Sequence, residues 1–179
     1  MIRPILVVGN PVLRQKAKRI SQVQDKPIQR LIDDMIATMR AAPGVGLAAP
    51  QVGVPLRLAV IEVDDKVTVL INPEIIKTFG EHELDEGCLS VPGFWGQVLR
   101  AEKVSVKALD RNGKEQRIRD AEGLFAQALQ HEIDHLDGTL YIDRVDSAER
   151  LQRSEPIRKP EAEARRRAEA EQEQEAEPA

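Results

Sequence analysis

The first strong periodic pattern in the chain lies between residues 27 and 42, where apolar positions recur three and four residues apart. This spacing places them on one face of an α-helix. Proline suits the first turn of a helix, and Pro27 stands at its start, whereas Pro43 and Gly44 follow its end. The pattern therefore predicts a helix that buries one apolar stripe, formed by Ile28, Leu31, Ile32, Met35, Ile36 and Met39.

Segments rich in β-branched residues follow this helix and predict strands. The runs at residues 56–63 and 66–73 are separated by Asp64 and Asp65, which suit a turn. Further on, residues 104–120 alternate between apolar and polar positions on both sides of Asn112-Gly113, a strong signal for a β-hairpin.

A second helix is predicted over residues 121–138, with Asp120 as its N-cap and Gly138 placed to end it. One side of this helix carries Leu124, Ala128, His131 and His135. The two histidines therefore lie where the apolar core would otherwise continue.

The composition changes near Ser147, after which the chain is almost entirely Glu, Arg, Ala and Gln, with a few prolines. Opposite charges four residues apart, such as Glu161 with Arg165, support a helix by only a few tenths of a kcal/mol. No apolar face is available for burial. We therefore predict a catalytic domain at residues 1–147 and a charged tail at 148–179, either a solvated helix or disordered.

Composition and charge remove several classes of function. The chain has 179 residues, 26 basic and 30 acidic, and its net charge of −4 gives no reason to expect DNA binding. No apolar run approaches the roughly 20 residues that span a bilayer, and no signal peptide is visible. The single cysteine, Cys88, excludes an internal disulfide, so a cytoplasmic enzyme is expected.

Residues 131–135 match the pattern H-E-x-x-H inside the second predicted helix. Because positions i and i+4 stack on one helix face, His131 and His135 can offer two imidazole nitrogens to one metal ion. Glu132 lies at the flank of the site, where a carboxylate can act on a metal-activated water. This is the arrangement of a metal-dependent hydrolase.

Catalytic metal sites usually take three protein ligands, so one more is needed. The candidates are Cys88, His82 and a carboxylate such as Glu86. Cys88 is favoured because its thiolate is a soft, anionic ligand, although a lone cysteine is often simply part of a core. His82 has no neighbour at ligand spacing and is expected on an exposed strand.

Three separated motifs together resemble the signature of the peptide deformylase family. They are GVGLAAPQ at residues 44–51, EGCLS at 86–90 and QHEIDHLDG at 130–138. They occur in the order and spacing of that family, and the resemblance covers roughly residues 3–145. Taken alone, the first motif also fits a plain glycine turn between a helix and a strand.

The resemblance implies a compact α+β domain in which antiparallel strands surround the metal-binding helix. It implies removal of the N-formyl group from the first methionine of nascent polypeptides, with release of formate. By this likeness Cys88, His131 and His135 hold one divalent ion, Fe(II) in much of the family, although Ni, Co or Zn can replace it. Glu132 moves protons, and the Gln51 side chain and the Leu89 backbone N–H stabilise the oxyanion.

Substrate contacts are also implied by the resemblance. Gly46 matches a backbone contact to the substrate, and the positions that match the methionine pocket are Val45, Leu124, Gln127 and Ala128. Several deformylases dock on the ribosome through a basic C-terminal helix. Here the tail is mixed and slightly acidic, with cationic residues between Arg150 and Arg167, so the ribosome is kept as a candidate partner.

Two other readings of the motifs lead to different functions. A general H-E-x-x-H metallopeptidase would take a later Glu or His as its third ligand, and past His135 only Asp137 is a weak candidate. A non-catalytic zinc module would close its site with four protein ligands, whereas three strong ones are present.

Overall fold

The computed structural model describes residues 1–154. Within this range the α-helices are α1 (Lys26–Ala41) and α2 (Gly123–Leu136). Four short 3-10 helices are η1 (Pro11–Arg14), η2 (Ala49–Val52), η3 (Tyr141–Arg144) and η4 (Ala148–Arg150). The strands are β1 (Gly46–Ala48), β2 (Leu58–Val63), β3 (Lys66–Phe79), β4 (His82–Cys88), β5 (Val91–Arg100), β6 (Lys103–Leu109), β7 (Glu115–Ala121) and β8 (Leu151–Arg153).

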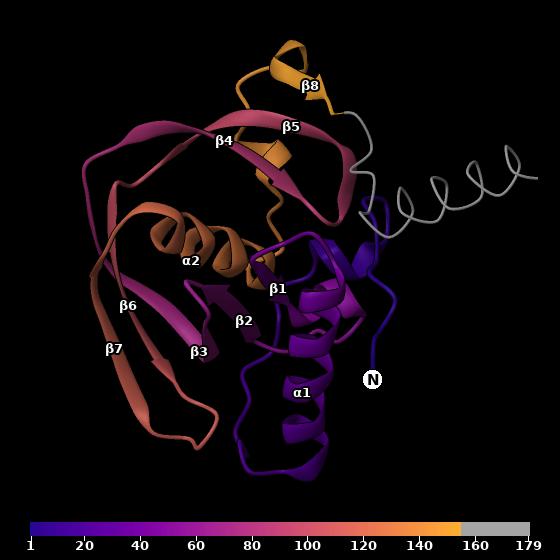
Figure 1. The fold of residues 1–179 in the computed structure, drawn as a ribbon, viewed down its shortest axis with the longest axis vertical. Coiled ribbons are helices and arrows are strands. Elements are labelled where there is room, and N and C mark those ends of the chain that lie inside the picture. Colours follow the sequence, from indigo (N-terminus) through magenta and orange to yellow (C-terminus); the bar gives the residue numbers. More distant parts are fainter. Residues whose placement is uncertain (155–179) are drawn as a thin grey trace, which may run out of the picture.

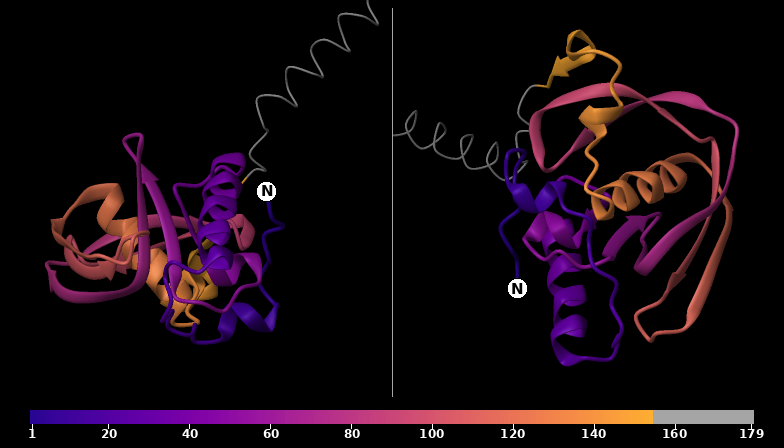
Figure 2. Two further views of the ribbon diagram at one scale, coloured as in Figure 1. Left: turned by 90° about the horizontal axis from the view of Figure 1, so that it is seen from below. Right: turned by 180° about the vertical axis from the view of Figure 1, so that it is seen from behind.

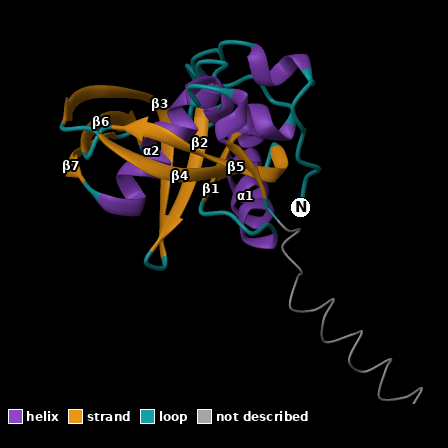
Figure 3. Ribbon diagram, turned by 90° about the horizontal axis from the view of Figure 1, so that it is seen from above, coloured by secondary structure: helices purple, strands orange, loops and turns teal. Residues whose placement is uncertain are grey.

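These strands form two antiparallel sheets that surround α2. The five-stranded sheet has the order β1-β2-β3-β6-β7, and the three-stranded sheet has the order β4-β5-β8. In Figure 1, α2 lies between β4 and β5 on one side and β1, β2 and β3 on the other, and the view from above shows the same enclosure (Figure 3). The predicted α+β fold, with antiparallel strands around a central helix, is confirmed.

The five-stranded sheet has a helix on each face. Successive side chains of a strand point to opposite faces, and β2 follows this rule. Ala59 and Ile61 pack toward α2, whereas Leu58 and Val60 pack toward α1. The two helices therefore lie on opposite sides of β2, as the two further views in Figure 2 also show.

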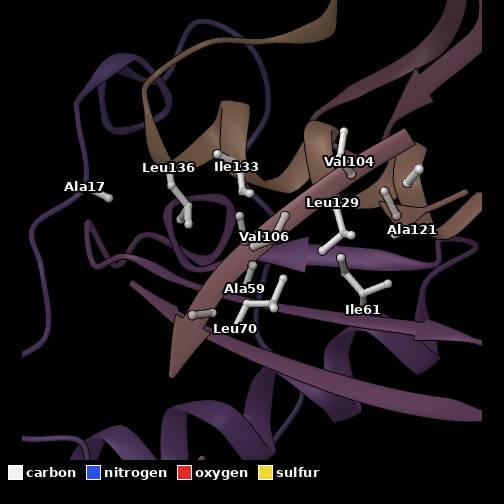
Figure 4. Close-up of a cluster of buried hydrophobic side chains, with 14 residues drawn as sticks. Ala17, Ala59, Ile61, Leu70, Val104, Val106, Ala121, Leu129, Ile133 and Leu136 are labelled. Atoms are coloured by element: carbon white, nitrogen blue, oxygen red, sulfur yellow. The ribbon is translucent and has the colours of Figure 1, made fainter. Parts of the chain in front are cut away.

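The core under α2 is aliphatic and contains few large side chains. Figure 4 shows Leu129, Ile133 and Leu136 of α2 directed at the strands that carry Ile61 and Val106. All five residues are almost fully buried. At about 25 cal/mol per Å² of apolar surface removed from water, this contact is a main source of stability and holds α2 at a fixed depth.

The predicted elements are mostly confirmed, and one boundary is wrong. The first helix, the β2–β3 pair and the hairpin at Asn112-Gly113 are present where expected. The predicted N-cap, Asp120, instead belongs to β7, because Ala121 still pairs with Val104 and extends the strand. Glu122 is the N-cap of α2.

Residues after the predicted domain limit at residue 147 still pack on the folded domain. Strand β8 pairs with Phe94–Gly96 of β5, so residues 151–153 extend the three-stranded sheet. The remainder of the predicted tail, residues 155–179, lies outside the described residues, and its solvated or disordered state stays a prediction. Within residues 1–154, no helix is long and apolar enough to cross a membrane.

Gly138 follows α2 in a left-handed conformation, with φ +78°, against the backbone at the end of η1. A Cβ at this position would lie 2.7 Å from the carbonyl oxygen of Arg14. We predict that Gly138→Ala lowers the free energy of unfolding by at least about 2 kcal/mol, measured by chemical denaturation.

Gly113→Ala is the matched control, because Gly113 has φ +80° and a Cβ there would meet only Val23 at an ordinary 3.6 Å. This substitution should cost about 1 kcal/mol, the backbone strain alone. Equal losses for the two variants would contradict a tight contact between Gly138 and Arg14.

Candidate metal centre and cleft

Two elements bring together the three predicted metal ligands. His131 and His135 lie one turn apart on α2, and Cys88 ends β4. The Nε2 atoms of the two histidines are 3.2 Å apart, and His135 Nε2 lies 3.3 Å from Cys88 Sγ. The three ligand atoms all lie within 4.8 Å of one another. The expectation that Cys88, rather than His82 or Glu86, joins the histidines agrees with this cluster.

These separations fit a tetrahedral metal site. With metal–nitrogen bonds of about 2.0–2.1 Å and a metal–sulfur bond of about 2.3 Å, ligand atoms lie about 3.3–3.6 Å apart. The observed 3.2 and 3.3 Å are close to this range. One thiolate and two imidazoles form a donor set that transition metals prefer over Mg²⁺ or Ca²⁺. Cys88, His131 and His135 therefore form a Cys-His-His metal site.

Two hydrogen-bond donors approach the sulfur atom of Cys88. The Ser90 backbone N–H donates to Sγ at 3.3 Å, and Gln51 Nε2 lies 3.6 Å from it. The Gln51 side chain is buried and is held at both ends, since its Oε1 accepts from the Ala48 N–H and its Nε2 donates to Ser90 Oγ. The amide of Gln51 is therefore fixed beside the metal ligand.

A buried carboxylate orients His131. Glu86 Oε1 lies 2.5 Å from His131 Nδ1, which sets the proton on Nδ1 and leaves Nε2 for a metal. Burial by itself would raise the pKa of Glu86, but hydrogen bonds from His131 and Arg100 outweigh it and lower the pKa to about 2. Glu86 therefore stays ionised and supports the ligand from behind.

Glu132 is a buried carboxylate without such a partner. It is 3% exposed, and its Oε2 has no hydrogen-bond partner among the described residues. Burial raises the pKa of its carboxyl group to about 7. A Cβ on Gly46 would collide with this carboxylate, coming within 2.9 Å of its Cδ, so glycine is required there for the close approach of β1 to α2.

A cleft of about 880 Å³ opens in front of these residues. His131, Glu132 and Cys88 reach its floor, while His135 is buried behind them. Gln51 and Leu89 line the cleft. The five predicted substrate-binding residues line it as well, namely Val45, Gly46, Leu124, Gln127 and Ala128. Their contact with a substrate stays a prediction.

The alternative ligands are engaged elsewhere or lie outside the cluster. Asp137 Oδ1 accepts a hydrogen bond from Arg57 at 2.6 Å, and His82 starts β4 away from the other ligands. Within residues 1–154, no fourth His, Cys, Asp or Glu joins the site. This arrangement matches an open catalytic site better than a closed structural one.

Sequence reasoning missed the residues behind the metal site. Arg100 binds Glu86 and Asp134, and it lies in phase with the buried Gly96 and Val98 of β5, although the apolar Leu99 obscures this alternation in the sequence. Asp134 precedes His135 inside the motif, and its acidic character in an otherwise buried helix is a second signal of a buried partner.

Comparisons with known proteins agree with this site. The family model described as Polypeptide deformylase matches residues 2–151. A peptide deformylase from Dehalococcoides mccartyi is 54% identical over 157 residues, which cover 87% of this chain and 93% of that protein.

Two solved structures have the same fold. A crystal structure of a peptide deformylase from Legionella pneumophila superposes with a TM-score of 0.80 at 45% identity, covering 99% of this chain and 100% of that one. A class I type b peptide deformylase from Acinetobacter baumannii with Met-Ala-Ser bound gives a TM-score of 0.78 at 34% identity, covering 81% and 99%. With its Cys-His-His metal site at the floor of a cleft, the chain belongs to the peptide deformylase family.

Proposed function

We propose that Glu132, Gln51 and Leu89 perform the chemistry by which this deformylase removes the N-formyl group from the N-terminal methionine of new polypeptides. The observation that carries this proposal is the juxtaposition at one cleft floor of the Cys-His-His site and a buried carboxylate without a partner. Both assist amide hydrolysis at neutral pH, because water is a weak nucleophile and an amine is a poor leaving group.

The divalent ion, when bound, acts as a Lewis acid that activates water and polarises the formyl oxygen. Cys88, His131 and His135 would hold it. Glu132 accepts the proton of the attacking water on its carboxylate and later donates it to the leaving amine, which departs as the free N-terminus of methionine. A pKa raised by burial suits both steps, since the group must take up and release a proton near neutral pH.

Gln51 and Leu89 supply hydrogen-bond donors for the charge that develops on the formyl oxygen. Gln51 Nε2 is held beside Cys88, and both residues line the cleft. Among residues 1–154, no acceptor is bonded to the Leu89 backbone N–H. Donors fixed before the reaction stabilise the transition state without a cost of reorientation.

The cleft suits an extended peptide with an apolar first side chain. Val45, Leu124 and Ala128 provide apolar surface next to the metal ligands, and Val45 and Leu124 are exposed. Gln127 is less open to a substrate, because its Nε2 donates to the Asp85 carbonyl at 3.0 Å. A bound Met-Ala-Ser peptide in the related structure from Acinetobacter baumannii supports methionine as the first residue.

Fe(II) is the ion that we propose for the site, with Ni, Co or Zn as substitutes. The thiolate donates more charge than an imidazole would, which we expect to make Zn the weaker Lewis acid in this site. The proposed compartment is the cytoplasm, where new polypeptides are made. The ribosome is kept as a candidate partner, because residues 155–179 that would carry such a contact lie outside the described residues.

Formate release from a formyl-Met peptide by anaerobically purified protein tests the proposed function. Glu132→Gln should lower kcat by about 10²–10⁴-fold, because it removes the group that moves the protons. The bound metal should be retained at the same stoichiometry, measured by metal analysis of the same sample. A variant that keeps metal and normal turnover would contradict the role of Glu132.

Gln51→Leu should lower kcat by about 10²–10³-fold, the usual loss for one oxyanion donor. Steady-state kinetics on a formyl-Met peptide measures the effect. Ser90→Ala is the matched control, since it removes a partner of Gln51 Nε2 but leaves the amide in place. If both variants lose activity equally, the effect of Gln51 comes from packing and not from its donor.

The raised pKa of Glu132 also predicts an effect on the stability of the metal-free protein. The ordinary pKa of this group is 4.5, so the unfolded chain loses the proton first as pH rises. The folded state is therefore penalised increasingly between pH 4.5 and 7, and fully above pH 7. Removing the charge with Glu132→Gln should stabilise the metal-free protein by about 3 kcal/mol at pH 8 and by less than about 1 kcal/mol at pH 5.

Denaturant unfolding of metal-free wild type and Glu132→Gln at both pH values measures this difference. Identical stabilities at pH 8 would mean that the carboxylate is solvated in the folded protein. That result would contradict the buried position of Glu132.

A further inference from the structure

A row of alternating charges leads from His131 away from the cleft. Glu86 binds His131 Nδ1 and accepts two hydrogen bonds from Arg100, at 3.0 and 2.5 Å. Arg100 also donates to Asp134 at 2.6 Å. At the far end, Arg144 Nε and Nη2 donate to the two oxygens of Asp134, each at 2.6 Å.

Burial makes the links among Glu86, Arg100 and Asp134 costly to break. The side chains of Arg100, Glu86 and Asp134 are 2%, 4% and 12% exposed, respectively, whereas that of Arg144 is 43% exposed. Two carboxylates and two guanidinium groups balance to zero formal charge. Without Arg144, two buried carboxylates would share the single charge of Arg100, and a buried charge that loses its partner is strongly destabilising.

Each residue in this row also fixes the orientation of the next side chain toward His131. A bidentate grip fixes the plane of a carboxylate, and Arg144 holds Asp134 in this way. Asp134 in turn holds one end of the Arg100 fork, whose other edge is bidentate to Glu86. The hydrogen bond between Glu86 and His131 Nδ1 then fixes the tautomer and the ring orientation of His131.

Arg144 belongs to η3, and a second residue of the same short helix, Tyr141, packs beside His131. The ring of Tyr141 lies alongside the His131 imidazole, with centroids 6.4 Å apart and planes 24° apart. The segment after α2 therefore packs against this metal ligand directly through Tyr141 and is linked to it indirectly through the row of charges that ends at Arg144.

We infer that Arg144 is a positioning residue for the metal centre, acting through Asp134, Arg100 and Glu86 to hold His131 in its ligating orientation. The inference rests on the Cys-His-His site of the proposed function, and it adds a residue outside the cleft to the parts that maintain it. Loss of Arg144 should lower the affinity of the site for the ion, because outer partners of a metal ligand contribute to metal affinity.

The test measures how fast a strong chelator removes metal from the full-length Co(II)-loaded protein. Arg144→Met should release metal about tenfold faster than wild type, the lower end of the range for outer partners of metal ligands. It should also alter the Co(II) absorption spectrum, which reports ligand geometry. Arg144→Lys keeps the charge but cannot donate to both oxygens of Asp134 in a bidentate way, so its rate of metal release should lie between those of wild type and Arg144→Met.

Arg150→Met is the matched control, since Arg150 is 46% exposed and pairs with Glu83 and Asp146 outside the row. It should release metal at the wild-type rate. The inference is overturned if Arg144→Met also releases metal at that rate with an unchanged spectrum, or if Arg150→Met accelerates release equally. Because the readout is metal release, this result is independent of whether formate is produced.

Discussion

Helix α2 is buried between two sheets although it carries several polar side chains, and the rest of the fold is arranged around it. Helix α2 carries Leu129, Ile133 and Leu136 on the side that faces the larger sheet, and their packing fixes its position. The same helix carries His131 and His135 on another side, where they meet Cys88 from the smaller sheet. The core and the metal site are therefore held by one rigid element, so the depth of the helix also sets the distances between ligands.

The polar groups on α2 fall into two kinds: some are held by paired charges, and one is buried without a partner. His131 and Asp134 are satisfied by a row of paired charges that reaches the surface at Arg144. Glu132 has no such support, and burial holds its pKa near 7. Paired charges fix the orientation of the metal ligand His131, whereas burial raises the pKa of Glu132 so that it can exchange a proton near neutral pH. A site that combines both sacrifices some stability of the metal-free fold for reactivity.

Much of this arrangement could be predicted from sequence, and the limits have physical causes. Periodicity located α1 and the Asn112-Gly113 hairpin, and the H-E-x-x-H spacing with Cys88 located the metal ligands. The N-cap of α2 was misplaced at Asp120, because strand pairing that extends β7 is not visible in local residue preference. Arg100 shares the buried face of β5 with Gly96 and Val98, but an arginine is normally exposed, and the local sequence does not show the carboxylates that pair with it.

X-ray absorption at the metal edge of the Zn-loaded protein can show whether one sulfur and two imidazole nitrogens hold the ion, with the remaining position facing the cleft. We expect one sulfur at about 2.3 Å and nitrogen or oxygen neighbours at about 2.0–2.1 Å, with imidazole scattering from two rings. A first shell without sulfur, or with a carboxylate in its place, would contradict this ligand set.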